Sequence, residues 1–180
     1  IKIIFKSWFI NFESSEISKE LRAGSLGDII FRSKDRIGKM ESKILAAVSS
    51  GELIPSEEYF SKKVFSNNTE KYLKVGRYDF AYNPSRINIG SIGMNKNSFL
   101  GAVSPIYNVF KVKKSWHWFI EQFIRLKSTN SKIKQLSSGS VRQSLSFEDF
   151  ASIPLTIPTE TSLQQFNKIY EIFRRKIIQN

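Results

Sequence analysis

The sequence predicts a mixed α/β (α+β) fold, in which one globular domain of short strands and helices lies between a helix at each end of the chain. Three observations lead to this prediction. The 180 residues suffice for one domain with a short appendage and are too few for two ordinary domains. Short alternating or β-branched runs in the middle indicate strands, and apolar residues recur at helical spacing near both ends. Hydrophobic residues make up 41% and aromatic residues 13% of the chain, which is enough for a sizeable core.

Residues 1–12, IKIIFKSWFINF, predict a helix with a narrow apolar stripe. Spacings of four, three and four residues align its apolar side chains along one helix face: Ile1, Phe5, Trp8 and Phe12. Residues 13–25 are polar and end in glycine and serine, so we interpret them as a linker. Because the chain begins inside a helical pattern, we interpret it as a piece of a longer protein.

The body of the chain, residues 26–158, predicts a domain of short strands with one central helix. The strand candidates are the runs KILAAV, YLKV, INIGSI and SPIYNVFKV, which are separated by the turn-forming sequences SSG, SNN, NPS and NKN. SWHWFIEQFIRLKS predicts the helix, because apolar side chains recur in it after three, four and three residues: Trp116, Phe119, Phe123 and Leu126.

Residues 159–180 give the clearest helix prediction. Thr161 and Gln164 fit a capping box, and prolines precede it. An apolar seam follows over only about two heptads, too short to predict a coiled coil by itself. Its members are Leu163, Phe166, Tyr170, Phe173 and Ile177. We expect the two terminal helices to pack on each other or on a continuation of the chain, and a homodimer through them stays open.

The charge balance points to a polyanionic partner. The chain has 28 Lys and Arg against 16 Asp and Glu, a net charge of +12. These basic residues are spread from end to end rather than bunched in a tail. A folded surface, rather than a disordered arm, therefore has to carry the binding.

The composition also excludes several kinds of site. Without cysteine there is no disulfide framework, thiolate metal site or cysteine nucleophile, which suits a reducing cytoplasm. The single histidine, His117, rules out a histidine metal cluster. No apolar run approaches the ~20 residues of a membrane span. We therefore expect no metal, no cofactor and no membrane association.

The sequence contains no positive argument for catalysis. The stretch Tyr82–Arg86, YNPSR, resembles the motif with which DNA adenine methyltransferases grip the target amine, but it lacks the second proline and the stacking ring. No glycine-rich turn with a downstream acid offers a cofactor site. Asp35 near Glu41 is only a loose imitation of a nuclease carboxylate cluster. We predict that the protein is not an enzyme.

Two polar clusters are the candidates for contact with nucleic acid. The first surrounds YNPSR, and the second is the loop SSGSVRQSLS, residues 137–146. Asn and Gln pair with adenine, and Arg or Lys with guanine, while hydroxyls and amides suit phosphates. The candidate residues for DNA contact are Lys74, Arg77, Tyr82, Asn83, Arg86, Asn88, Lys96, Asn97, Ser138, Ser140, Arg142 and Gln143. The alternative for each cluster is an ordinary surface loop, in which Asn83 and Pro84 only shape the turn.

Five stretches, in order, resemble the specificity (S) subunit of type I restriction-modification enzymes. IFKSWFINFE is similar to the end of that family's conserved spacer helix, and SLGDII to the start of a target recognition domain. GRYDFAYNPSRINIGSIGM with GAVSPIYNVFKV resembles the middle of that domain, and SGSVRQSLSFEDFASIPLTIP its end. LQQFNKIYEIF is similar to the start of the second conserved helix. The match covers nearly the whole chain and departs from the common pattern at PTETSLQQ, where many relatives have two prolines and an acid.

This resemblance implies a non-catalytic protein that binds double-stranded DNA. Residues 1–12 are then the end of the first conserved helix, 13–25 a linker, 26–158 one target recognition domain and 159–180 the start of the second helix. In that family the two helices pair antiparallel as a spacer, each domain recognises half of a bipartite target, and partner subunits carry out methylation and restriction. Two alternatives stay open: the recognition part of a fused restriction-methylation enzyme, and an RNA-binding module that stacks bases on exposed aromatic rings.

Overall fold

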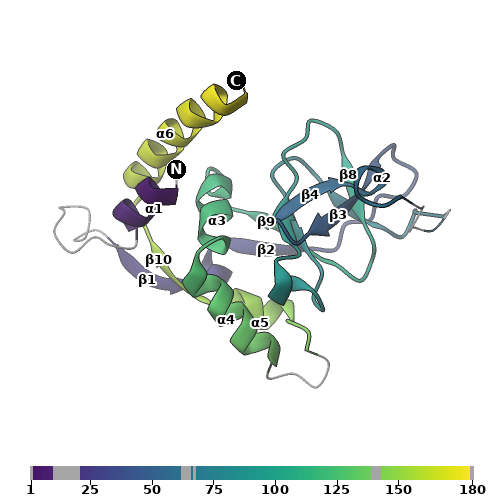
Figure 1. Ribbon diagram of the computed structural model, residues 1–180, viewed down its shortest axis with the longest axis horizontal. Coiled ribbons are helices and arrows are strands. Elements are labelled where there is room, and N and C mark those ends of the chain that lie inside the picture. The colour runs from purple at the N-terminus through teal and green to yellow at the C-terminus, as the bar shows by residue number, and fades with distance from the viewer. Residues whose placement is uncertain (1, 10–20, 62–65, 67, 139–142, 179–180) are drawn as a thin grey trace.

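A computed structural model describes residues 2–9, 21–61, 66, 68–138 and 143–178. Figure 1 shows helices α1 and α6 side by side at one end of the molecule, with strands β3, β4 and β8 at the opposite end and α4 and α5 along a third side. Among the described residues the helices are α1 (Lys2–Phe9), α2 (Ser56–Tyr59), α3 (His117–Ile124), α4 (Lys127–Ser138), α5 (Phe147–Ala151) and α6 (Glu160–Ile178), with 3₁₀ turns η2 (Leu26–Asp28) and η3 (Ile87–Ile89).

Two four-stranded sheets and a two-stranded ribbon make up the β-structure of the described residues. The strands are β1 (Arg22–Ser25), β2 (Ile30–Ser33), β3 (Lys43–Val48), β4 (Glu52–Pro55), β5 (Leu73–Val75), β6 (Phe80–Tyr82), β7 (Ile92–Met94), β8 (Gly101–Val103), β9 (Asn108–Val112) and β10 (Pro154–Ile157). One sheet has the order β2-β9-β6-β7 and is antiparallel throughout. The other has the order β4-β3-β8-β5, with β3 and β8 parallel. Strands β1 and β10 pair antiparallel.

Most of the predicted elements are found. KILAAV is β3, and YLKV and SPIYNVFKV contain β5 and β9. The run INIGSI begins as the 3₁₀ turn η3 and becomes strand β7 only at Ile92, because Gly90 turns the chain with φ 96°. Residues 22–25, which the sequence placed in a linker, form strand β1, because β10 at the far end of the domain supplies the hydrogen-bonding partner. The mixed α/β class is confirmed, and the exact domain boundaries stay predictions.

The two terminal helices pack on each other and on α3 within one chain. Phe5 and Phe9 of α1 are 0% and 1% exposed. Their ring centroids lie 5.5 and 5.4 Å from that of Phe166 in α6, and 5.0 and 5.1 Å from that of Phe119 in α3. Buried tilted and edge-to-face rings of this kind combine large apolar area with favourable ring geometry. The aromatic cluster therefore attaches both ends of the chain to the domain.

The predicted apolar seams are correct only in part. In α1 the buried positions are Phe5 and Phe9, one turn apart, while Trp8 is half-buried and Phe12 lies outside the described residues. In α6, Leu163, Phe166 and Tyr170 are buried. Phe173 is 41% exposed because α6 extends past the rest of the domain (Figure 1), and the side chain of Ile177 is not described.

The helix cap lies two residues before the position that the sequence predicted. Helix α6 begins at Glu160, and the backbone N–H of Ser162 donates to the Thr159 hydroxyl at 3.3 Å. Thr159 thus caps the helix in place of Thr161, and Gln164 bonds to Glu160 within the helix.

Truncation of Phe166 is expected to destabilise the packing of the terminal helices on the domain. Phe166→Ala removes a fully buried ring from the aromatic cluster, and we expect it to lower the free energy of unfolding by about 3–5 kcal/mol. Phe173→Ala, in the same helix but exposed, is the matched control and should cost less than about 1 kcal/mol. Urea unfolding followed by circular dichroism measures both. Equal losses would show that the cluster does not hold α6.

His117, the first residue of α3, stacks on the ring of Tyr78. Its ring lies 4.2 Å from that of Tyr78 at an angle of 16°, and the guanidinium of Arg77 lies 4.8 Å from the centre of the Tyr78 ring. Burial of the imidazole lowers the pKa of His117 below its usual 6.5.

This shift predicts a pH-dependent part of the stability. The unfolded chain binds the His117 proton more tightly than the folded protein, so the free energy of unfolding should fall as the pH drops below about 6.5 and level off below the folded-state pKa. His117→Gln removes that component. Urea unfolding of both proteins between pH 8 and pH 5 measures the difference, and a pH-independent difference would contradict the prediction.

Candidate nucleic-acid interface

The YNPSR segment is a tight turn built by Asn83. The side-chain oxygen of Asn83 accepts from the N–H of Ser85 at 3.1 Å, and its carbonyl accepts from the N–H of Arg86 at 3.0 Å. The N–H of Asn83 donates to the carbonyl of Ser91 at 3.1 Å, across the neck of the loop. An asparagine that bonds the backbone two residues on is a common turn device. Asn83 is half-buried and shapes the loop, which presents the exposed Arg86 at its surface.

The two predicted polar clusters meet in space although about sixty positions separate them. The N–H of Leu145, at the end of the second cluster, donates to the carbonyl of Pro84 at 3.0 Å. The Tyr82 hydroxyl donates to the carbonyl of Leu145 at 3.4 Å. The YNPSR turn and the segment that leads into α5 therefore form one surface.

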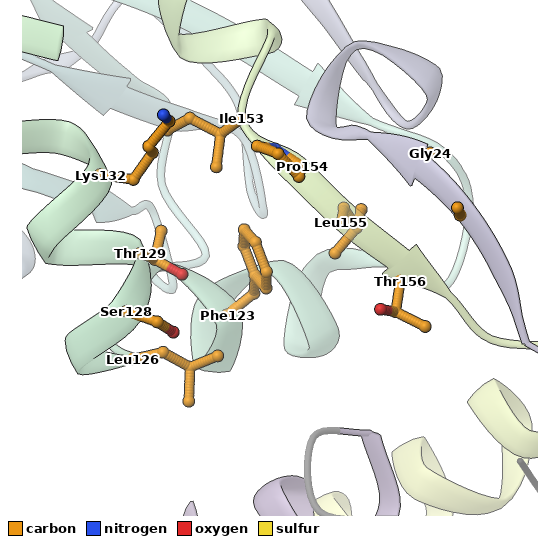
Figure 2. A pocket seen from close by; sticks show the side chains of 11 residues that line it. Gly24, Phe123, Leu126, Ser128, Thr129, Lys132, Ile153, Pro154, Leu155 and Thr156 are labelled. Atoms are coloured by element: carbon orange, nitrogen blue, oxygen red, sulfur yellow. The ribbon is translucent and has the colours of Figure 1, made fainter.

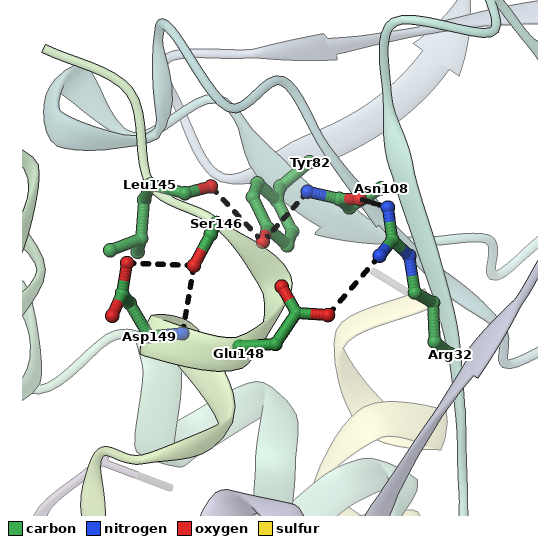
Figure 3. A network of polar contacts seen from close by, with 7 residues as sticks. All are labelled: Arg32, Tyr82, Asn108, Leu145, Ser146, Glu148 and Asp149. Carbon is green, nitrogen blue, oxygen red and sulfur yellow. Dashed lines mark hydrogen bonds and ion pairs between the residues drawn. The ribbon is translucent and has the colours of Figure 1, made fainter.

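A polar network continues from this junction to strand β2 (Figure 3). The Nδ2 group of Asn108 donates to the Tyr82 hydroxyl at 2.9 Å, and its Oδ1 accepts from Nη2 of Arg32 at 2.9 Å. Nη1 of Arg32 pairs with Oε1 of Glu148 in α5 at 3.3 Å. Tyr82 is fully buried, and burial raises the pKa of its hydroxyl well above the usual 10.0, so it acts here as a neutral hydrogen-bonding group.

A hollow of about 410 Å³ lies beside this network, and we call it the loop hollow. Its wall includes Pro84 from the YNPSR turn, Glu148 and Asp149 from α5, and Ile106, which is 65% exposed. Arg32 lines it as well. The loop hollow thus combines one cation, two carboxylates and an exposed apolar side chain. Base edges offer hydrogen-bond donors and acceptors and the thymine methyl group, and such a mixture suits them better than it suits phosphate.

A second hollow of about 310 Å³ adjoins the first and is strongly basic. Arg32, Pro105 and Tyr107 line both hollows. We call the second one the basic groove; its cations are Arg32, Lys34, Arg36 and Lys71. No carboxylate is among the described residues that line it.

The cations of the basic groove lack acid partners in the described part of the chain, apart from the Arg32–Glu148 pair. Asp35 lies between Lys34 and Arg36 in sequence but pairs with Lys111 at 3.0 Å instead. The hydrogen bond from Lys111 holds the pKa of the Asp35 carboxyl below its usual value. Unpaired cations along one groove create the positive field that attracts a polyanion.

The sequence did not single out the residues of the basic groove, although it carried a signal for three of them. FRSKDR places a basic residue at every second position, and alternate side chains of an extended segment point the same way. Lys71 had no such signal. It reaches the groove because Ile37 and Gly38 donate to the carbonyls of Tyr72 and Glu70, at 2.8 and 3.1 Å.

The structure corrects one of the predicted DNA contacts, Tyr82, while Lys96 and Asn97 stay predictions. Tyr82 is 0% exposed and belongs to the core. Lys96, whose side chain is 35% exposed, forms an ion pair with the buried Glu121 of α3. Asn97 donates to the side chain of Asn95 beside it, so this turn holds itself together.

The remaining predicted contacts stay predictions. Arg77, Arg86, Ser138 and Gln143 are exposed, and Lys74 and Asn88 are half-buried. The Ser138 hydroxyl donates to the carbonyl of Lys134 within α4. Ser140 and Arg142 lie outside the described residues.

A third cavity, of about 480 Å³, lies between the β1–β10 ribbon and helices α3 and α4 (Figure 2). Its wall is largely apolar, with Phe123, Leu126 and Leu155 facing the space, and Lys132 is the one charged residue among the described residues that line it. Within the described residues, no three His, Cys, Asp or Glu side chains are grouped to hold a metal ion, and no helix is long and apolar enough to span a membrane. Because Lys132 is its one charged residue, the described lining of this cavity contains no pair of an acidic and a basic side chain.

Comparison with known proteins identifies the class of fold. No family model matches the chain, and no curated protein is significantly similar to it in sequence. Among solved structures, the type I restriction-modification S subunit from M. genitalium matches with a TM-score of 0.60 and 13% identity, over 99% of this chain and 47% of that one. The HsdS subunit from Thermoanaerobacter tengcongensis matches with a TM-score of 0.52 and 8% identity, over 99% and 43%.

A third match comes from a structural study of complex assembly and conformational transition of the type I R-M system, with a TM-score of 0.55 and 14% identity, over 90% of this chain and 44% of that one. The chain therefore spans just under half the length of each of these proteins. It has the fold of type I S subunits, which confirms the predicted resemblance at the level of the fold.

The turn that follows YNPSR is expected to tolerate only glycine at position 90. Gly90 has φ 96°, and a Cβ atom there would lie 2.5 Å from the carbonyl oxygen of Ser49. We expect Gly90→Ala to lower the free energy of unfolding by about 2–4 kcal/mol, through backbone strain and the clash. Gly38 also has positive φ, 57°, but open space around it, so Gly38→Ala should cost only about 1–2 kcal/mol. Urea unfolding compares them, and equal costs would mean that Ser49 moves away freely.

Proposed function

We propose that this chain is a DNA-recognition module: the specificity subunit, or a half or fragment of it, of a type I restriction-modification system. In this role it has no catalytic activity. It binds double-stranded DNA in the cytoplasm and directs methyltransferase and restriction subunits to one half of a bipartite target. The observation that carries the proposal is the basic groove, which opens into the loop hollow. The fold shared with S subunits supports the same role.

The two adjoining hollows suit the two parts of a DNA duplex. Lys34, Arg36 and Lys71 have no acid partner in the described residues and suit phosphates, whose neutralisation supplies the sequence-independent part of DNA affinity. The loop hollow beside them offers both acceptors and donors, which sequence discrimination requires. Arg86 and Gln143, exposed on the two loops that meet at Pro84 and Leu145, are candidates for further contacts.

The exposed aromatic rings do not favour the RNA-binding alternative. Phe31, Tyr59 and Phe173 are 52%, 51% and 41% exposed, but they belong to β2, α2 and α6 and not to one surface element. Single-stranded RNA is typically bound by bases stacked on neighbouring rings. Competition between duplex DNA and single-stranded RNA separates the two functions, and preferential binding of RNA would contradict the proposal.

The apolar side chains left exposed on the terminal helices are candidates for contact with partners. Ile3 of α1 is 83% exposed, and Ile172 and Phe173 of α6 are 50% and 41% exposed. A continuation of the helices, a second copy of the chain or a partner subunit would cover them. In the alternative of a fused restriction-methylation enzyme, the same domain serves a catalytic part of its own chain. A cofactor motif in the adjoining sequence would decide for that alternative.

Replacing three groove cations should weaken the dependence of DNA binding on salt. For the triple variant Lys34→Gln, Arg36→Gln and Lys71→Gln, we expect the slope of log K against log salt concentration to become shallower by about 0.9 for each phosphate that the variant no longer neutralises. Fluorescence anisotropy with a labelled duplex at several salt concentrations measures the slope.

A charge-matched control removes the same charge elsewhere. Lys127, Lys134 and Lys168 are exposed on α4 and α6 and line neither hollow, so their replacement by Gln lowers the net charge equally. We expect this control to retain most of the wild-type slope. If the slope becomes equally shallow in both variants, the basic groove is not the phosphate-binding surface.

A further inference from the structure

Arg32 occupies the boundary between the basic groove and the loop hollow and lines both. Its side chain is 39% exposed. The guanidinium carbon also lies 5.7 Å over the ring of Phe147, which supports it from one side. A ligand that fills both hollows has to pass this side chain.

The inner side of Arg32 is held by a directional chain of hydrogen bonds (Figure 3). The Tyr82 hydroxyl donates to the carbonyl of Leu145 and so accepts from Nδ2 of Asn108. This orients the Asn108 amide with its oxygen toward Arg32, which donates to it at 2.9 Å. Asn108 is 6% exposed and Tyr82 is 0% exposed, so the anchor is part of the core. A guanidinium held in this way loses less conformational freedom when it binds a ligand.

The outer side of Arg32 has a partner that is easily exchanged. The Glu148 side chain is 72% exposed, and an ion pair this open to solvent contributes little to stability. A ligand with two acceptors can therefore replace Glu148 on Nη1 and accept from the second N–H of Nη2, while Asn108 keeps its own bond to Nη2. Glu148 and Asp149 also line the loop hollow, where their charges disfavour phosphate.

We propose that Arg32 is a base-reading residue that recognises the guanine of one G·C pair through its planar guanidinium, and that Asn108 and Tyr82 position it. Arginine in the major groove makes its commonest specific contact with the O6 and N7 acceptors of guanine. Glu148 keeps phosphates away from Arg32 and lies where it can accept from the amino group of the paired cytosine. This inference rests on the proposed binding of duplex DNA and adds to it one recognition contact.

Selection from a pool of random duplexes tests the inference. Bound DNA is sequenced for the wild-type chain, Arg32→Lys and Lys34→Gln, and the overall affinity for the pool is measured in parallel. Arg32→Lys keeps the charge but loses the planar fork, so we expect overall affinity within about twofold of wild type, together with a roughly 5- to 150-fold loss of preference at one G·C position. Lys34→Gln should bind the whole pool more weakly and enrich the wild-type motif.

Tyr82→Phe provides the test of positioning. It removes only the hydroxyl that orients Asn108, and we expect the preference at the same G·C position to weaken while the rest of the motif is kept. A purely structural role of Tyr82 would lower the melting temperature without changing the motif, and that result would remove Asn108 and Tyr82 from the mechanism.

The outcomes separate this inference from the proposed function. If Arg32→Lys enriches the same motif to the same degree as wild type, Arg32 does not recognise a base, while DNA recognition by the chain stands. If the wild-type chain binds no duplex, the proposed function itself fails and the inference fails with it.

Discussion

The hydroxyl group of Tyr82 lies in the interior of the domain, and a buried hydroxyl requires hydrogen-bond partners. It finds them in Asn108 of the neighbouring strand and in the carbonyl of Leu145, about sixty positions away in sequence. The bond to Asn108 lies within the β2-β9-β6-β7 sheet, and the bond to Leu145 connects that sheet with the segment that leads into α5. The bond from Leu145 to Pro84 extends the same network to the YNPSR turn, and the bond from Arg32 to Asn108 extends it to Arg32. The residues around the loop hollow are therefore held in place by hydrogen bonds to buried side chains.

Buried contacts also attach the terminal helices to the domain. Phe166 lies against Phe5 and Phe9, and the Tyr170 hydroxyl donates to the buried carboxylate of Glu121 at 2.6 Å. Glu121 also pairs with Lys96, in the turn after β7. A buried carboxylate is tolerated only when cations and donors satisfy it, so these contacts depend on one another. Helix α6 and the rest of the domain are thus joined by both apolar and polar contacts, which fix the direction of the helix relative to the domain.

The sequence predicted features that depend on local pattern and missed those that depend on distant partners. Strand β3 and helix α3 were found because their periodicity is local. Tyr82 was misassigned because a tyrosine in a polar segment gives no sign that Asn108 and Leu145 enclose it. Arg32 was not among the sequence candidates because its contacts are with Asn108 and Glu148, which lie far along the chain. The resemblance to S subunits succeeded where local reasoning failed, because five ordered stretches carry information about the whole fold.

The net charge of +12 does not by itself explain a binding site, because most of it is scattered. In the described part of the structure, ion pairs occupy some of the acids and leave other basic residues without an acid partner. Asp35, the acid that lies between Lys34 and Arg36 in sequence, pairs with Lys111 and does not line the basic groove. Lys34, Arg36 and Lys71 then lie together, with no acid among the described residues that line the same space. The positive charge of the basic groove therefore depends as much on where Asp35 is paired as on how many basic residues the chain contains.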